Sequence, residues 1–284
     1  MNSSIHDLLA EATRTLAAAD VESPRTDAAL LLGEVLNRDR SFMIAHPEYL
    51  VAADQLQKFR EFIARRAAGE PLQYITGHQE FFKLDFRITP DVLIPRPETE
   101  IIVEAALEVA PRNSSLLIAD IGTGSGCLIV SLLSELPQAR GIATDSSFEA
   151  LRVAEDNARR HDVIDRLELI QADAFSAFPD RAAFSLILSN PPYVPSTEID
   201  KLQREVRDHE PLHALVSGPD GLSHIRKYLE DAARFLSARG YFIFEIGFGQ
   251  REAVEELIDA EVWDLIEIRN DLQNIPRTFI LQKS

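Results

Sequence analysis

The stretch Leu116-Leu-Ile-Ala-Asp-Ile-Gly-Thr-Gly-Ser-Gly126 decides the fold of this 284-residue chain. Its first half is an apolar run of the length of a buried strand, and its glycines let the backbone approach a ligand at the start of a following helix. The spacing G-x-G-x-G differs from the G-x-G-x-x-G of dinucleotide sites, because Cys127 stands where the last glycine or alanine would fall. The loop therefore favours an adenosine ligand without a pyrophosphate, although by itself it also fits a plain strand-to-helix turn.

Apolar runs and amphipathic segments alternate through the C-terminal part of the chain. Helical patterns separate most of the candidate strands, notably at 147–160 and 222–238, and the strands lie at 116–121, 141–144, 167–171, 184–189 and 241–246. Such alternation implies right-handed crossovers and a parallel, doubly wound sheet. Two further runs, 262–268 and 278–282, are joined by a polar turn too short for a helix, so we expect an antiparallel hairpin at the sheet edge. The predicted fold is α/β, with seven strands, mostly parallel.

The first part of the chain is predicted to be a small helical bundle without visible chemistry. Ser4 and Asp7 form a start signal for one helix, Pro24 begins a second, and a third ends before Gly69. Alternating apolar residues from Phe82 to Ile88 then indicate a β-hairpin. We expect an N-terminal helical substrate-recognition domain over residues 1–75, a hairpin linker over 76–92, and the α/β domain over 93–284.

Charge limits the choice of partners. The chain has 29 Lys and Arg against 46 Asp and Glu, a net charge of -17 that disfavours a nucleic-acid-coating protein. We interpret the pairs Arg65-Arg66 and Arg159-Arg160 as solvated helix faces. No apolar run is long enough to span a bilayer and the first 19 residues do not resemble a secretory signal, so we expect a cytoplasmic protein. One cysteine excludes a disulfide framework and a multi-thiolate zinc site.

A second motif, Ser189-Asn190-Pro191-Pro192-Tyr193, follows the fourth candidate strand at the edge where doubly wound folds bind ligands. Two prolines stiffen the segment, the Asn190 carboxamide offers both an acceptor and donors, and Tyr193 offers an aromatic face. The alternative is a proline-rich strand exit with a turn asparagine. Asp145 closes the second strand, where it would either bind ribose hydroxyls or cap the next helix.

A third motif, His209-Glu210-Pro211-Leu212-His213, matches the zinc pattern H-E-x-x-H. That pattern requires an unbroken helix, and Pro211 interrupts it. We therefore expect no metal. His161 is expected at a helix end, where the helix dipole favours it.

A longer set of segments carries a resemblance to a known family. The segments occur in order: Tyr74-Ile-Thr-Gly77, Glu80-Phe-Phe82, Thr89-Pro90, Leu93-Ile-Pro-Arg-Pro-Glu-Thr-Glu100, Asp120 to Cys127, Ser189 to Tyr193, Glu210-Pro211, Asp220-Gly-Leu222 and Glu245-Ile-Gly247. In them the chain resembles the bacterial peptide chain release factor glutamine methyltransferases. These are class I S-adenosylmethionine-dependent enzymes with an Asn-Pro-Pro-Tyr motif, and they also carry a helical N-terminal domain.

The resemblance implies methylation of the side-chain amide nitrogen (N5) of the glutamine in the Gly-Gly-Gln loop of release factors. It implies that the Asn190 side-chain oxygen and the Pro191 carbonyl accept hydrogen bonds from the substrate amide, with Pro192 and Tyr193 packed around it. The cofactor residues it implies are Asp120, Gly122, Thr123, Gly124, Ser125 and Gly126 for the methionine end, Asp145 for the ribose, Asp173 and Ala174 for the adenine, and Asn190. Ala174 lacks the aromatic ring that some relatives carry.

The same resemblance implies that Arg96, Pro97 and Thr99 fold over the cofactor, although Pro97 also suits a plain helix start. The expected partner is a release factor, with no direct nucleic acid and no membrane, and the expected state is a monomer. Three alternatives remain: a glutamine methyltransferase of a ribosomal protein, an adenine-N6 methyltransferase of nucleic acids, and an idle cofactor-binding module. The net acidic N-terminal domain disfavours the nucleic-acid enzyme, and the intact motifs disfavour the idle module.

Overall fold

The computed structural model describes residues 3–111, 115–180 and 183–284, in two compact units. The first unit contains Met1–Gly77 together with Gln203–His209, and the second contains His78–Leu202 and Glu210–Ser284. Met1 and Asn2, at the start of the expected helical domain, lie outside the described residues. The sequence does not predict that the segment 203–209 belongs with the N-terminal helices.

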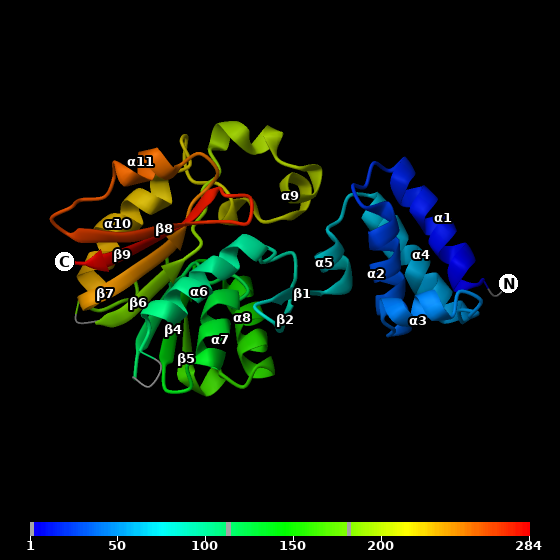
Figure 1. Ribbon diagram of the computed structural model, residues 1–284, viewed down its shortest axis with the longest axis horizontal. Helices are drawn as coiled ribbons and strands as arrows, with labels where there is room; N and C mark the ends of the chain where they lie inside the picture. Colours follow the sequence, from blue (N-terminus) through cyan, green and yellow to red (C-terminus); the bar gives the residue numbers. More distant parts are fainter. Residues whose placement is uncertain (1–2, 112–114, 181–182) are drawn as a thin grey trace. The chain divides into compact units, whose positions relative to one another are not determined.

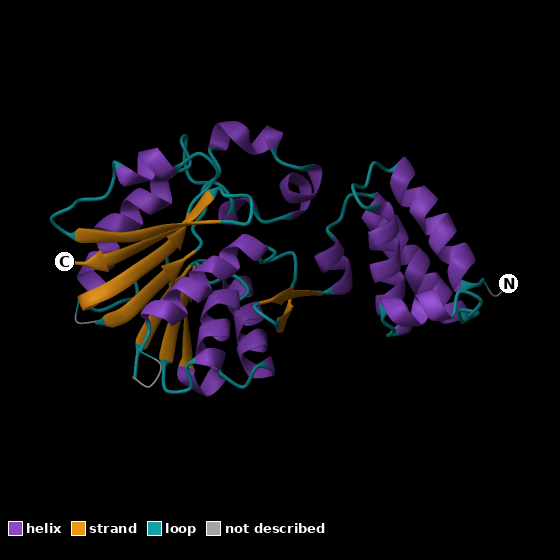
Figure 2. Ribbon diagram, in the orientation of Figure 1, coloured by secondary structure: helices purple, strands orange, loops and turns teal. Residues whose placement is uncertain are grey.

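The first unit is helical, as shown in purple in Figure 2. Its helices are α1 (Ile5–Ala18), α2 (Pro24–Leu36), α3 (Arg40–Ala45), α4 (Ala53–Ala67), α5 (Leu72–Thr76) and α9 (Arg204–His209). Ser4 caps α1 as expected, because its hydroxyl accepts from the Asp7 backbone N–H (3.2 Å). The apolar stripes form one core, in which Ile5, Leu31 and Phe59 are buried.

One charged cluster is buried in this first unit, and it corrects a prediction. Arg66 is only 5% exposed, so the interpretation of Arg65-Arg66 as a solvated face is wrong for Arg66. Its Nε donates to Asp27 Oδ2 (2.7 Å) and its Nη2 to Glu205 Oε1 (2.6 Å). Glu205 lies on α9, 139 residues away, and a pattern of neighbouring residues cannot reveal a partner at that separation.

The second unit contains a seven-stranded sheet in the order β5-β4-β3-β6-β7-β9-β8. The strands are β3 (Leu117–Ile121), β4 (Arg140–Asp145), β5 (Leu167–Gln171), β6 (Phe184–Ser189), β7 (Leu236–Glu245), β8 (Trp263–Asn270) and β9 (Pro276–Lys283). The neighbours from β5 to β7 pair in parallel, and β9 pairs antiparallel with both β7 and β8. The predicted fold class is therefore confirmed, including the antiparallel hairpin at the edge.

Helices cover both faces of this sheet (Figure 1): α6, α7 and α8 lie on one face, and α10 and α11 lie on the other. The helices are α6 (Glu100–Val109), α7 (Cys127–Glu135), α8 (Phe148–Arg160), α10 (Ser223–Phe235) and α11 (Arg251–Glu255), and the short 3-10 turns are η1 (Pro97–Thr99), η2 (Ile164–Arg166), η3 (Ser196–Lys201) and η4 (Leu212–Ala214). The pattern predicted as helix to residue 238 ends at Phe235, because β7 begins at Leu236.

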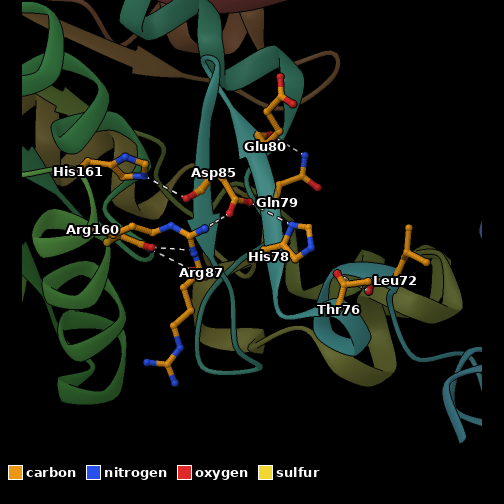
Figure 3. A network of polar contacts seen from close by, with 10 residues as sticks. Leu72, Thr76, His78, Gln79, Glu80, Asp85, Arg87, Arg160 and His161 are labelled. Atoms are coloured by element: carbon orange, nitrogen blue, oxygen red, sulfur yellow. Dashed lines mark hydrogen bonds and ion pairs between the residues drawn. The ribbon is translucent and has the colours of Figure 1, made fainter. Parts of the chain in front are cut away.

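A two-stranded sheet, β1 (His78–Phe81) and β2 (Leu84–Arg87), packs against α8. The Arg87 N–H donates to Asn157 Oδ1 (2.7 Å), and Asp85 lies between His78, Arg160 and His161 (Figure 3). His161 follows α8 at its C-cap, as predicted, with its Nε2 3.0 Å from the Asp85 carbonyl oxygen. These contacts connect the hairpin to the same helix whose N-terminus faces the pocket described next.

Candidate active site

A pocket opens at the carboxyl edge of the sheet, where β3, β4, β5 and β6 end. This is the edge at which doubly wound folds bind ligands. Its lining contains the following residues: Asp91, Val92, Leu93, Pro95, Thr99, Gly122, Thr123, Gly124, Ser125, Cys127, Leu128, Asp145, Ser146, Ala150, Ala172, Asp173, Ala174, Asn190, Pro192, His213, Ala214, His224 and Tyr228.

The glycine loop performs two different tasks. Gly122 and Gly124 have positive φ (+73° and +54°), and a Cβ built on either would meet no atom within 4 Å, so both face open space in the pocket. Gly126 is the N-cap of α7 with φ +81°, and a Cβ there would come within 3.2 Å of the Ala154 side chain. Gly126 therefore allows α7 and α8 to pack closely and does not line the pocket.

Asp145 lines the pocket and also holds the loop. Its Oδ2 accepts from the Gly124 N–H (2.9 Å), and its Oδ1 accepts from the Ser147 N–H (2.9 Å), just before α8. Ser147, and not Asp145, is the N-cap of α8, so the expectation that Asp145 caps this helix is wrong, while its place in the pocket lining leaves the ribose role as a prediction. Each of its carboxylate oxygens retains a further lone pair. Asp173 and Ala174 line the pocket beyond β5.

Asp120 lies behind the loop and is absent from the pocket lining. It is 1% exposed, and its Oδ2 accepts from the Thr123 hydroxyl (2.6 Å), while its Oδ1 has no hydrogen-bond partner among the described residues. Burial, assisted by repulsion from Asp145, raises the pKa of Asp120 to about 7. A cation reaching this carboxylate would meet an unsatisfied acceptor.

Asn190 presents the other unsatisfied acceptor of the site. Its Nδ2 donates to Thr99 Oγ1 (3.1 Å), whereas its buried Oδ1 has no hydrogen-bond partner in the described part of the chain. The Thr99 hydroxyl in turn donates to Glu245 Oε2 (2.6 Å). Asn190, Thr99 and Pro192 line the pocket, while Pro191 is buried outside the lining.

Tyr193 supports the loop from outside the pocket lining. Its backbone carbonyl accepts from Gln250 Nε2 (2.9 Å), and its phenol interacts electrostatically with Glu245. Burial raises the pKa of the Tyr193 phenol above its usual range. The phenol is therefore neutral and is not poised to act as a base.

Of the residues just before α6, some form structural contacts and others line the pocket. Arg96 is absent from the pocket lining and forms an ion pair with Glu210, whose Oε2 also accepts from the Ile94 N–H (3.2 Å). Pro97 begins η1, as its alternative role predicted, and Thr99 at the end of η1 reaches the pocket.

The two histidines of the H-E-x-x-H motif do not lie on one helix. His209 ends α9 and η4 begins at Leu212, so no single helix carries the two histidines. Within residues 3–111, 115–180 and 183–284, no group of three or more His, Cys, Asp or Glu is arranged to hold a metal ion.

Several pocket residues were not singled out in the sequence. His224 and Tyr228 come from α10, four residues apart, and that i, i+4 spacing was the only available signal that they share a face. Burial lowers the pKa of His224, whose Nδ1 lies 2.8 Å from the Ser217 hydroxyl. Cys127 also lines the pocket, and burial raises its pKa to about 12, so its thiol remains protonated.

Comparison with known proteins agrees with the fold. Residues 7–77 match the family model described as the PrmC N-terminal domain, and residues 99–207 match the methyltransferase small domain. A methyltransferase structure from Pyrococcus furiosus is 16% identical, with a TM-score of 0.53 over 82% of this chain and 100% of that chain. The 16S rRNA N2 G1207 methyltransferase of T. thermophilus, solved with AdoMet and guanosine, is 14% identical, with a TM-score of 0.50 over 73% of this chain and 49% of that one.

The fold, the glycine loop and the matched domain define this protein as a methyltransferase. Release factor glutamine methyltransferases of Koribacter versatilis and Nitratidesulfovibrio vulgaris are 43% and 38% identical to it, over 96% and 100% of this chain and 96% of each relative. The chain belongs to the release factor glutamine methyltransferase family.

Proposed function

We propose that this protein transfers a methyl group from S-adenosyl-L-methionine to the side-chain amide nitrogen (N5) of the glutamine in the Gly-Gly-Gln loop of a peptide chain release factor, with S-adenosyl-L-homocysteine as product. One observation carries the proposal: a buried carboxamide oxygen, Oδ1 of Asn190, lacks a hydrogen-bond partner at the lining of the pocket. An unsatisfied acceptor suits a substrate NH2 group. Family membership supplies the identity of the substrate.

The pocket residues fit this cofactor. Open space in front of Gly122 and Gly124 accommodates a ligand chain. Asp120, which lies behind the loop and outside the pocket lining, has an unpaired Oδ1 that suits an ammonium group. Lone pairs of Asp145 remain for ribose hydroxyls, and Asp173 and Ala174 would border the adenine. When bound, S-adenosylmethionine supplies an electrophilic methyl group on a sulfonium.

The protein's own contribution to catalysis is positioning. An amide nitrogen is a weak nucleophile because its lone pair is delocalised into the carbonyl, so the reaction depends on alignment. We propose that Asn190 Oδ1 and the Pro191 carbonyl each accept one hydrogen bond from the substrate NH2, which orients the nitrogen and favours the positive charge that develops on it. The two prolines hold this segment rigid, and no side chain need remove a proton before transfer.

The remaining roles follow from this substrate. We propose that the helical first unit helps to recognise the release factor, that the enzyme acts as a monomer in the cytoplasm, and that no nucleic acid binds directly. Among the described residues, no helix is long and apolar enough to cross a membrane.

The decisive assay incubates the protein with methyl-labelled S-adenosylmethionine and a bacterial release factor, either wild type or with the loop glutamine replaced by alanine. We expect label on the wild-type factor only, because only the glutamine supplies an amide nitrogen to the Asn190 acceptor. A ribosomal protein preparation serves as the competing substrate. Equal labelling of both release factors would contradict the proposal, as would preferential labelling of a ribosomal protein.

Asn190→Ala tests the acceptor itself. We expect turnover to fall by roughly a hundredfold or more, since an interaction made mainly in the transition state is lost, while affinity for the cofactor changes only a few fold. Single-turnover rates and calorimetric titration measure the two quantities separately. A rate within a few fold of wild type would remove Asn190 from the proposed mechanism.

A further inference from the structure

We infer that Glu245 is a positioning residue that acts through Thr99 to hold the Asn190 carboxamide with its oxygen directed to the substrate. This inference rests on the proposed function. It assigns a role to a side chain that neither lines the pocket nor touches the substrate amide.

Residues from three separate elements form a chain of two hydrogen bonds, from Glu245 through Thr99 to Asn190, which we call the relay. Glu245 ends β7, Thr99 ends η1, and Asn190 follows β6. The Asn190 Nδ2 donates to Thr99 Oγ1 (3.1 Å), and Thr99 Oγ1 donates to Glu245 Oε2 (2.6 Å). Glu245 and Thr99 are each 2% exposed, so water has little access to the hydrogen bond between them.

The direction of the two hydrogen bonds follows from the chemistry of a hydroxyl. Thr99 has one proton, and an ionised Glu245 can only accept, so that proton points to Glu245. Toward Asn190 the hydroxyl can then only accept, which requires the carboxamide NH2 on that side. The opposite atom, Oδ1, is therefore left as the unpaired acceptor of the site.

This orientation matters because a carboxamide is nearly symmetric in shape. Rotated by half a turn, Asn190 would present an NH2 group to the substrate NH2, and two donors would face each other. Without the directing partner, the two orientations of the carboxamide would be populated less unequally. Steric packing alone does not distinguish the two orientations, whereas a hydrogen-bonded relay does.

The surroundings of Glu245 make the relay sensitive to protonation. Burial raises the pKa of Glu245 to about 7; Thr99, Arg277 on β9 and Tyr193 oppose that rise, and Glu98 adds to it. Cys127 on α7 also interacts electrostatically with Glu245. A protonated Glu245 can donate to Thr99, which frees the hydroxyl proton to point at Asn190 and reverses the relay.

The kinetic test compares Thr99→Val, which keeps the shape without the hydroxyl, with Thr99→Ser, which keeps the hydroxyl. We expect kcat of Thr99→Val to fall about tenfold, with KM for the release factor and Kd for S-adenosylmethionine within about threefold. Thr99→Ser should remain within about threefold of wild type on the same principle. A Thr99→Val enzyme with wild-type kcat, or a Thr99→Ser enzyme as slow as Thr99→Val, would overturn the inference.

A second readout is independent of methyl transfer. The side-chain amide NMR signal of Asn190, assigned by its absence from Asn190→Ala, should shift with pH around the pKa of Glu245, near 7. The shift should vanish in Glu245→Gln and in Thr99→Val. A signal that ignores pH in the wild-type protein, or that still titrates in both variants, would refute the relay.

The two readouts separate the relay from the proposed function. Should the wild-type protein fail to methylate a release factor while the Asn190 signal behaves as expected, the proposed function falls and the orientation by Glu245 stands. Should the protein methylate a release factor while the Asn190 signal does not respond to pH, the proposed function stands and the relay is refuted.

Discussion

Two carboxyl side chains, Asp120 and Glu245, are enclosed in the α/β unit at 1% and 2% exposure. Burial raises the pKa of each to about 7, because an ionised carboxylate loses its hydration inside the protein. Each lies behind a pocket residue, Asp120 behind Thr123 and Glu245 behind Thr99. Both carboxyl groups are therefore close to the pocket, and ionising either of them lowers the free energy of unfolding.

Ionisation of these buried carboxyl groups makes the free energy of unfolding depend on pH. The pKa of Asp120 rises from 3.8 to about 7 on folding, so its contribution to stability is full below about pH 4 and is lost as the pH rises through 7. We expect Asp120→Asn to match wild type at or below about pH 4, to become the more stable of the two as the pH rises, and to exceed wild type at pH 8 by about 1–4 kcal/mol. Urea unfolding of both proteins at several pH values measures the difference. Parallel pH profiles would contradict it.

For single residues, the sequence predicted which side chains lie near the pocket, but not which of them line it and which form structural contacts instead. Gly122, Gly124, Asp145 and Asn190 line the pocket because each lies at the carboxyl end of a parallel strand or within three residues after it. Arg96 instead pairs with Glu210, 114 residues away. A partner at that distance is determined by tertiary packing and leaves no local signal.

Helix α9 belongs to the first unit, although it lies more than a hundred residues further along the chain than the other helices of that unit. Its Glu205 pairs with Arg66 of α4, and Arg204 donates to the Ala68 carbonyl (3.1 Å). Arg66 also pairs with Asp27 of α2, so one guanidinium connects three helices of the first unit. Its planar, forked geometry suits two carboxylates at once.

Removing this guanidinium should therefore destabilise the helical unit. We expect Arg66→Ala to cost about 3–5 kcal/mol, because the buried Asp27 carboxylate loses its partner. The exposed Arg159, paired with Glu155 on one helix, is the matched control, and Arg159→Ala should leave the unfolding midpoint close to that of wild type. Denaturant unfolding measures both, and trypsin cleavage at Arg204 and Arg207 should accelerate only in Arg66→Ala. Equal effects of the two variants would refute the structural role of Arg66.

The long amphipathic elements were predictable and the short ones were not. The stripes of α1, α2 and α8 repeat over three or more turns, which makes the period clear. Helices α3 and α5, of six and five residues, are too short to show a period. The boundary between α10 and β7 was misplaced because the segment after Phe235 pairs with β6, a non-local contact.

For the whole molecule, charge separates the candidate substrates. The net charge of -17 repels a polyanion, whereas recognition of a protein loop requires no basic surface. The adenine-N6 methyltransferase considered from the sequence is the alternative that this charge disfavours.

Nucleic acids should accordingly fail as substrates. Incubated with labelled S-adenosylmethionine at about 0.15 M salt, total RNA and duplex DNA should take up no label above background, because phosphate contacts that drive such binding are unfavourable here. A release factor in a parallel reaction is the positive control. Labelled adenine in either nucleic acid would contradict the expectation.

The sequence by itself determined the α/β class, the place of the pocket, and the residues at the strand ends. These follow from local periodicity and from short motifs whose members are neighbours in the chain. Only the tertiary structure decided that Gly126 serves packing, that Arg66 is buried, that segment 203–209 joins the helical unit, and that Glu245 reaches Asn190 through Thr99. Each of these depends on contacts between residues far apart in sequence, and such contacts exist only after the chain has folded.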